Sequence, residues 1–536
     1  MFRKNEGHNQ TTMFSAVNSL PDNVKKRLES SWADAFYQYY FKKIDESVFA
    51  PLYSTKSSRP NVPVNVLIGF ETLKAGLGLS DEAMYNSFLF DVQVRYALGL
   101  YDLDAGYFDL RTLYYFRAAL NSYEQEHGSS LITLATQAVV KDQMETFRLK
   151  GGLQRMDSTL IQSNIRAMSR LQLVFTIIQR LIILASEEDI KGNPTLFEPY
   201  QKEDAQHLCY KIKYQDRTSR LEQAGIHLHQ MLDLLYTRHG TNELWKQAMQ
   251  VFTEHFTLVE KAVTINDPGS MSGSTMQSPH DPEATYRTKG HDSARGYVAN
   301  LSETCDPSNE VQLITSTQVQ PNTTDDQALL AEALPHLQQD MGLDTLLTDG
   351  GYAGPVSAKA LDAHGVTLKT SAIKGAKRTR DAVGLEAFTQ EKTADGHQII
   401  RCMQGLTGRV KTGPNGTWTT VAFPEATCAG CPFQDQCPAK RVMKKDIRIV
   451  RFTKNSLRVA QTRKIVQEEG PQIRNQRASI ESTVRSVIHV FGGHLCKLAV
   501  RGRQRVRDYI VYSAMMVNVR RLSKFVGENR RIAMVN

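Results

Sequence analysis

The chain has 536 residues, of which 41% are hydrophobic, and it carries a net charge of +9 with a pI near 9.0. A chain of this length can bury a large core and predicts about two to four domains. It contains no apolar run of about eighteen residues and no apolar signal core near its start, which argues against a membrane span or export and predicts a cytoplasmic protein.

Residues 1–150 are predicted to be mostly helical. PVNVLIGFETLKAGLGLSDEAMYNSFLF shows helical apolar spacing, with Ser80 and Asp81 as candidate caps for a new helix. No catalytic group of residues is visible in this region. Taken alone, it fits either a structural helical domain or a helical DNA-binding domain.

Residues 151–375 are predicted to form an α/β sheet interrupted by helices. Residues 153–165 read as a strand with Asp157 near its middle, and residues 166 to about 262 read as long helices. After the turn-rich segment DPGSMSGSTMQSP, three strands are expected at residues 294–302, 311–318 and 345–348, with a helix at about 325–339.

Asp349 follows the last of these strands and precedes Gly350 and Gly351, which permit a sharp turn. Ligands of open α/β sheets gather at the carboxyl ends of strands, so a metal-binding carboxylate is expected there. Alone, Asp349 also fits an ordinary turn residue, and Asp157 an ordinary edge-strand or turn residue.

Residues 376–455 are predicted to be a separate strand-and-turn segment with four clustered cysteines. Their spacing is C-x25-C-x2-C-x5-C, formed by Cys402, Cys428, Cys431 and Cys437. Four thiolates that include one CxxC knuckle suit a tetrahedral structural zinc ion. The alternative is a set of unconnected buried thiols, and Cys209, Cys305 and Cys496 have no comparable neighbours.

Residues 456–536 are predicted to be helical and lie in a basic block. Residues 438–536 contain 23 Lys or Arg against 6 Asp or Glu, a plausible footprint for nucleic acid, although a solvated charged surface is the alternative. On a helix, Arg474, Arg477, Glu481 and Arg485 share one side, within roughly 80°. Ile473, Ile480, Val484, Val487 and Phe491 lie on the adjacent face.

Glu481 alone also fits an exposed helix with i, i+4 ion pairs. Together, however, Asp157, Asp349 and Glu481 could hold two divalent ions that cut and rejoin phosphodiester bonds. The chain contains no GxxxxGK[ST] motif, so ATP-driven transport along DNA is not suggested, and it contains no GxSxG or HExxH motif.

The three acidic motifs, QRMDSTLIQSN, LLTDGGYAG and RASIESTV, resemble in order those of DDE transposases of bacterial insertion sequences, most nearly the insertion-sequence 1182 family. The resemblance covers nearly the whole chain. It implies an RNase H-like core after a helical N-terminal DNA-binding domain at 1–150. That core would span 151–375 and 456–536, with a helical insertion at about 166–262 and a Cys-rich β insertion at 376–455.

The resemblance also implies residue roles. Asp157, Asp349 and Glu481 would be the catalytic ligands of two Mg²⁺ or Mn²⁺ ions, and Arg477 would be the signature arginine. The basic residues expected to contact DNA are Arg474, Arg477, Arg485, Lys497, Arg501 and Arg503. The implied partners are terminal inverted repeats and target DNA, bound by a homodimer or larger synaptic complex.

Two positions depart from related signatures. These often place a Tyr shortly before the arginine and a Lys seven residues after the glutamate, but here the upstream segment EEGPQIRNQ has no Tyr and the later position is Ile488, with His489 next. From the resemblance of its three acidic motifs, the chain is expected to be a transposase. An RNase H-like nuclease or resolvase without strand transfer, or an inactive domesticated DNA-binding protein, remains the alternative.

Overall fold

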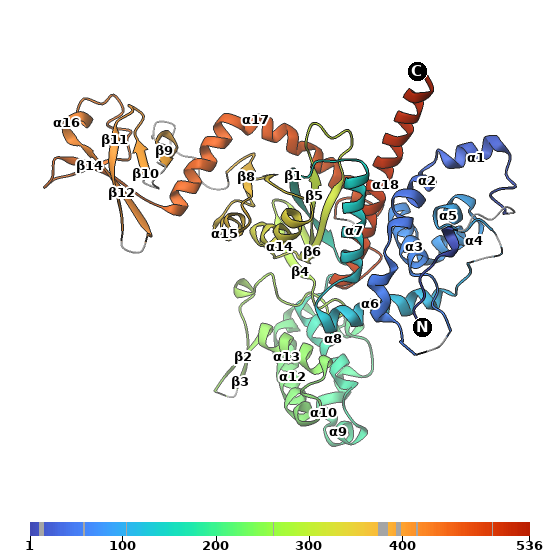
Figure 1. The fold of residues 1–536 in the computed structure, drawn as a ribbon. Helices are drawn as coiled ribbons and strands as arrows, with labels where there is room; N and C mark the ends of the chain where they lie inside the picture. The colour runs from blue at the N-terminus through green and yellow to red at the C-terminus, as the bar shows by residue number, and fades with distance from the viewer. Residues whose placement is uncertain are drawn as a thin grey trace.

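The computed structural model describes residues 1–9, 15–56, 59–102, 104, 106–260, 262–373, 384–392, 398–413, 416–495 and 497–535. It is a mixed α/β fold in which a central sheet is joined to helical regions and to a second sheet (Figure 1). Cys496 and the predicted boundary between residues 375 and 376 lie outside the described residues. No described helix is long and apolar enough to cross a membrane.

The central sheet has the strand order β4-β5-β1-β7-β8, with β6 also paired to β5. Its strands are β1 (Leu153–Gln162), β4 (Thr285–Lys289), β5 (Asp292–Thr304), β6 (Ile314–Pro321), β7 (Thr345–Thr348) and β8 (Thr367–Thr370). β1 runs antiparallel to β5 and parallel to β7, which is parallel to β8.

The four predicted strands of this sheet are confirmed as β1, β5, β6 and β7, and the helix predicted at 325–339 is α14 (Asp326–Gln339). α15 (Pro355–His364) connects β7 to β8. Strands β4 and β8 were not predicted. Their sequences, TYRTK and TLKT, are short and polar, so they lack the apolar alternation that marks a strand.

The N-terminal region is helical, as predicted. Its α-helices are α1 (Asp22–Glu29), α2 (Trp32–Tyr39), α3 (Val64–Leu77), α4 (Asp81–Phe90), α5 (Val92–Ala97), α6 (Leu110–His127) and α7 (Leu131–Thr146). Ser80 is the N-cap of α4, because its hydroxyl accepts a hydrogen bond from the backbone N–H of Ala83 over 3.1 Å.

Between β1 and β4 the chain forms a helical unit with its own hydrophobic core. Its α-helices are α8 (Arg170–Ile182), α9 (Glu187–Gly192), α10 (Pro194–Phe197), α11 (Ala205–Tyr210), α12 (Arg217–His239) and α13 (Glu243–His255). The prediction of helix up to about residue 262 is wrong at its end. The β-branched segments FTLV and AVTI form a hairpin of β2 (Phe256–Val259) and β3 (Ala262–Ile265).

His255, at the end of α13, is almost fully buried, and burial together with the nearby charge of Arg170 lowers its pKa to about 4. Arg170 Nε donates a hydrogen bond to His255 Nδ1 over 2.9 Å, so the fold holds the neutral ring. An unfolded histidine has a pKa of about 6.5. The neutral His255 ring therefore stabilises the fold fully above about pH 6.5, and this stabilisation is lost as the pH falls towards the folded pKa.

We expect the helical unit to lose roughly 3 kcal/mol of stability between about pH 7 and pH 4. Protease resistance of residues 170–265, followed across this range, measures the loss. His255→Gln is expected to remove most of the pH dependence, because glutamine does not titrate. If His255→Gln keeps the wild-type dependence of protease resistance on pH, other titrating groups cause the loss of stability.

The Cys-rich region contains the second sheet, with strand order β13-β14-β12-β11-β10-β9. Its strands are β9 (Thr389–Lys392), β10 (Gln398–Arg401), β11 (Thr407–Thr412), β12 (Trp418–Pro424), β13 (Lys440–Val442) and β14 (Ile447–Thr453), with α16 (Glu425–Cys428) after β12. The predicted strand-and-turn character is confirmed. Its buried apolar core is small and includes Val421, Phe423 and Val450.

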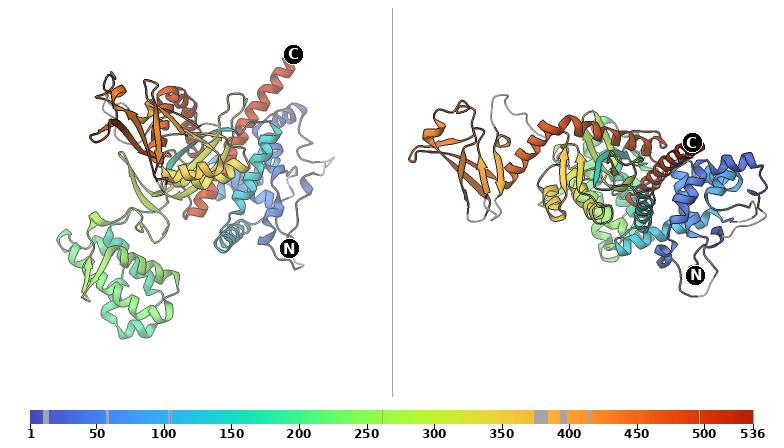
Figure 2. Two further views of the ribbon diagram at one scale, coloured as in Figure 1. Left: turned by 60° about the vertical axis from the view of Figure 1, so that its left-hand side comes forward. Right: turned by 45° about the horizontal axis from the view of Figure 1, so that its top comes forward.

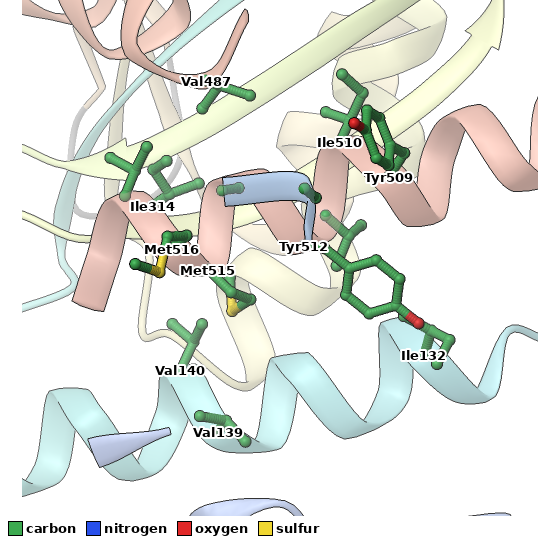
Figure 3. Packing of buried hydrophobic residues seen from close by; sticks show 14 of the residues in the cluster. Ile132, Val139, Val140, Ile314, Val487, Tyr509, Ile510, Tyr512, Met515 and Met516 are labelled. Carbon is green, nitrogen blue, oxygen red and sulfur yellow. The ribbon is translucent and has the colours of Figure 1, made fainter. Parts of the chain in front are cut away.

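Two long helices complete the chain, α17 (Lys454–His489) and α18 (Arg503–Val535). α17 runs from the Cys-rich sheet to the central sheet (Figure 2). α18 lies between α7 and the central sheet and is buried on all sides from Tyr509 to Val519. Figure 3 shows its Met515 and Met516 between Ile314 of β6 and Val140 of α7. The helical prediction for this region is confirmed.

Candidate active site

Asp157 lies in the middle of β1, opposite Leu301 of β5. β1 is an interior strand, so the alternative of an edge-strand aspartate is wrong. Its side chain is only 17% exposed, and its Oδ1 accepts a hydrogen bond from the backbone N–H of Ser158 over 2.9 Å. The carboxylate therefore lies close to the surface of the sheet with little contact with water.

Asp349 directly follows β7, the parallel neighbour of β1. The pairing sets Leu153 opposite Thr345 and Arg155 opposite Leu347. Two residues further along this register, Asp157 comes level with Asp349. The two carboxylates are close enough for the charge of Asp349 to raise the pKa of Asp157. Adjacent parallel strands thus bring together two acids that are far apart in the sequence.

Gly351 has a different role from the predicted one. Neither Gly350 nor Gly351 has a positive φ, so the turn does not require glycine for its backbone conformation. Instead, a Cβ on Gly351 would lie 3.0 Å from Asp349 Oδ1 and 2.8 Å from Asp326 Oδ2. A larger residue here would crowd both carboxylates and push their oxygens aside.

Glu481 lies on α17, on the side that also carries Arg477. Arg477 donates from one terminal nitrogen to Asp157 Oδ2 over 2.9 Å and from the other to Glu481 Oε1 over 3.4 Å. The adjacent face is buried as predicted, through Ile473, Ile480, Val484 and Val487, whereas Phe491 lies beyond the helix end and packs on Tyr509. The structure therefore links Asp157 to Glu481 through one guanidinium group.

The donor chemistry of this group suits Mg²⁺ or Mn²⁺, which prefer carboxylate oxygen. Burial raises the pKa of Asp157, while Arg477 and the Ser158 N–H oppose the increase. Among the described residues, no three His, Cys, Asp or Glu side chains are already arranged to hold an ion. The Glu481 side chain is 66% exposed, and Arg477 occupies the space between it and Asp157.

A buried ion-pair network lies beside these acids and was not identified from the sequence. Glu303 of β5 is fully buried and pairs with Arg155 Nε over 2.7 Å and with Arg521 of α18 over 2.8 Å. Thr483 of α17 donates to the same carboxylate over 2.8 Å, and Arg155 also donates to the backbone oxygen of Gln476. The network joins β1 and β5 to α17 and α18. The sequence signal that could have identified this network was a charged residue within an apolar strand segment: Arg155 in LQRMD and Glu303 in NLSET.

Two further residues near the acids were missed. Asp326, the first residue of α14, is 8% exposed and accepts a hydrogen bond from Ser158 Oγ over 3.1 Å. Tyr352 is buried and donates to Asn300 Oδ1 over 2.7 Å. Burial raises the pKa of Tyr352, and the charges of nearby aspartates add to this effect. Only the approach of α14 to the sheet brings Asp326 to this place.

The residues predicted to bind DNA differ in their surroundings. Arg474 and Arg485 are exposed on α17, and Arg501 is exposed before α18. Lys497 donates from Nζ to the backbone oxygen of Ile165 over 2.6 Å. Arg503 pairs with Glu283 over 2.9 Å. Arg474, Arg485 and Arg501 are therefore the cations most open to an incoming phosphate.

Cys402, Cys428, Cys431 and Cys437 all line one cavity in the Cys-rich region. Burial raises the pKa of the Cys428 thiol; Arg448 opposes this, and the other three cysteines are close enough to add to it. Within the part of the chain that the structure describes, their sulfur atoms are not gathered into a ready-made metal site. The four cysteines are neighbours, which is not the case for Cys209 and Cys305.

A comparison with known families matches part of the chain. Residues 402–523 match a family model described as a transposase DDE domain. No curated protein and no solved structure matches the chain. The matched segment includes Arg477 and Glu481 but ends far short of Asp157 and Asp349. This match supports a DDE transposase and thereby a nucleic-acid-processing enzyme.

Proposed function

We propose that this protein is a DNA transposase of the insertion-sequence 1182 family, which cuts DNA at transposon ends and transfers the cut strand into target DNA. One observation carries the proposal. Asp157 of β1 comes level with Asp349, which follows the parallel neighbour β7, and Arg477 of α17 contacts both Asp157 and Glu481. The family match over α17 supports the same assignment independently.

The central sheet supports an RNase H-like core for this enzyme. β1 carries the first acid and is flanked by antiparallel β5 on one side and parallel β7 on the other. The second acid follows β7, and Arg477 of α17 links the third acid to Asp157. The helical unit at 170–265 and the Cys-rich sheet are insertions into this core.

Two Mg²⁺ or Mn²⁺ ions, when bound by Asp157, Asp349 and Glu481, would activate the attacking water and stabilise the leaving 3′ oxygen. Water attack at the phosphorus breaks its bond to the 3′ oxygen and leaves a 3′-OH at the transposon end. That hydroxyl then attacks a target phosphate, forms a new phosphodiester bond and displaces the 3′ oxygen of the adjoining target nucleotide. Arg477 leaves Asp157 and turns its planar donor group to a DNA phosphate, a geometry to which arginine is suited.

DNA is held by the exposed arginines and by the N-terminal helices. Arg474 and Arg485 lie on the same helix as Glu481 and contact phosphates on either side of it. Ile488, at the position where related signatures have Lys, is buried and cannot contact DNA, whereas Arg485 is exposed and replaces it. Two ends must be joined, so the active species is a homodimer or a larger synaptic complex.

The test uses purified protein, Mg²⁺ and labelled DNA that carries the inverted repeats flanking the coding region, with a plasmid as target. We expect labelled strands joined to the plasmid. Cleavage without joining would favour a nuclease or resolvase, and DNA binding without cleavage would favour a domesticated DNA-binding protein. A random DNA of equal length is the control for sequence specificity.

We also propose that Cys402, Cys428, Cys431 and Cys437 bind one structural zinc ion, because they line a common cavity in a sheet with a small apolar core. Metal analysis is expected to find about one zinc ion per chain. The double variant Cys428→Ser/Cys431→Ser should lose it and expose residues 385–453 to protease.

Cys209→Ser changes a cysteine in the helical unit and is the control. This variant should keep the zinc ion of the Cys-rich region. Chelation of wild-type protein should reproduce the protease sensitivity of the double variant. Zinc-free wild-type protein with an intact Cys-rich region would leave these cysteines as ordinary half-buried thiols.

A further inference from the structure

We infer that Asp326 is a fourth carboxylate of the acidic site and shares in binding its divalent cation. The inference rests on the proposed function. Asp326 is the first residue of α14, and its side chain is more than nine-tenths buried against the central sheet. One of its oxygens, Oδ1, is oriented by the hydroxyl of Ser158, the residue next to Asp157.

The other oxygen of Asp326, Oδ2, lies near Asp349 Oδ1. A Cβ built on Gly351 would lie 2.8 Å from Asp326 Oδ2 and 3.0 Å from Asp349 Oδ1. Both oxygens therefore lie close to the Cβ position of Gly351. The distance between them cannot exceed the sum of their distances to that position. Burial raises the pKa of Tyr352 well above its ordinary value, and the charges of Asp326, Asp157 and Asp349 add to this effect. The charges of all three carboxylates therefore reach one hydroxyl, that of Tyr352.

No described residue neutralises Asp326. Its Oδ2 accepts no hydrogen bond within the described parts of the chain, and no lysine or arginine described there forms an ion pair with it. The nearby cation, Arg477, pairs with Asp157 and Glu481 instead. A counter-charge stabilises a carboxylate in a largely buried residue, and the N-terminus of α14 supplies only part of one. A hard divalent cation bound by oxygen ligands supplies the remainder.

The test measures Mn²⁺ binding to the DNA-free chain by calorimetry, with Mn²⁺ alone as the probe. Asp326→Asn is expected to weaken Mn²⁺ binding about 10- to 100-fold, while keeping the acceptor for Ser158. Asp325→Asn is the matched control. It removes the same charge from the same helix end, but Asp325 is exposed and acts as the N-cap of α14, a role that asparagine retains. Its Mn²⁺ affinity should be that of the wild type.

Wild-type Mn²⁺ affinity in Asp326→Asn, beside a clear loss in Asp157→Asn, would overturn the inference and leave the proposed function standing. Undiminished binding in Asp157→Asn would instead overturn the proposed site. A measurement on the wild-type chain removes any dependence on variant folding. Fe²⁺ with ascorbate and peroxide should cut the backbone close to residue 326 as well as near 157 and 349, and an uncut segment around 326 would refute the inference.

Discussion

Asp157→Asn is expected to slow Mg²⁺-dependent cleavage of inverted-repeat DNA by about 10³-fold or more, because several kcal/mol of transition-state stabilisation depend on the bound ions. Asparagine keeps the hydrogen bond from the Ser158 N–H, so the strand should be undisturbed. It removes one negative charge from the site proposed to bind the ions. Single-turnover cleavage of labelled DNA measures the effect, and gel-shift affinity for the same DNA should not fall.

Asp340→Asn provides the control, since this exposed aspartate follows α14 and lies outside the acidic group. It should cleave at the wild-type rate. Asp349→Asn should behave like Asp157→Asn, since the two side chains share one end of the sheet. Full Mg²⁺-dependent cleavage by Asp157→Asn would show that the site has been assigned to the wrong residues.

Glu303→Gln is expected to destabilise the fold by about 3–5 kcal/mol, the usual cost of removing one partner from a buried ion pair. Glu303 is fully buried and faces both Arg155 and Arg521, so glutamine would leave one buried and one partly buried guanidinium group without this charged partner. The reduction in the free energy of unfolding can be followed by chemical denaturation. Hydrogen exchange should rise first in α17, because Thr483 and the Gln476 carbonyl belong to the same network.

Glu310→Gln makes the same chemical change at an exposed position in the loop before β6 and should leave stability unchanged. Cleavage by Glu303→Gln should also fall, because the network holds α17, and with it Glu481, against β1. Wild-type stability in Glu303→Gln would mean that the two arginines are solvated or paired elsewhere in solution.

Local sequence pattern was sufficient for the elements that carry the acids. An apolar run ending at Thr348 predicted that Asp349 follows a strand, and helical spacing placed Glu481 beside Arg477 with Ile480 and Val484 on the buried face. These predictions succeed because strand and helix periodicity are recorded within a few residues. The same rule failed at β8 and at the β2–β3 hairpin, where short segments carry little periodic signal.

The sequence by itself determined that one acid lies on a strand, a second directly follows a strand and a third lies on a helix, in a basic chain with a cysteine cluster. Only the tertiary structure decided that β1 and β7 are parallel neighbours, so that Asp157 comes level with Asp349. It also decided that Arg477 lies between two acids and that Asp326 is buried beside Ser158. The physical reason is that strand register and helix docking depend on contacts between segments hundreds of residues apart, which no local pattern records.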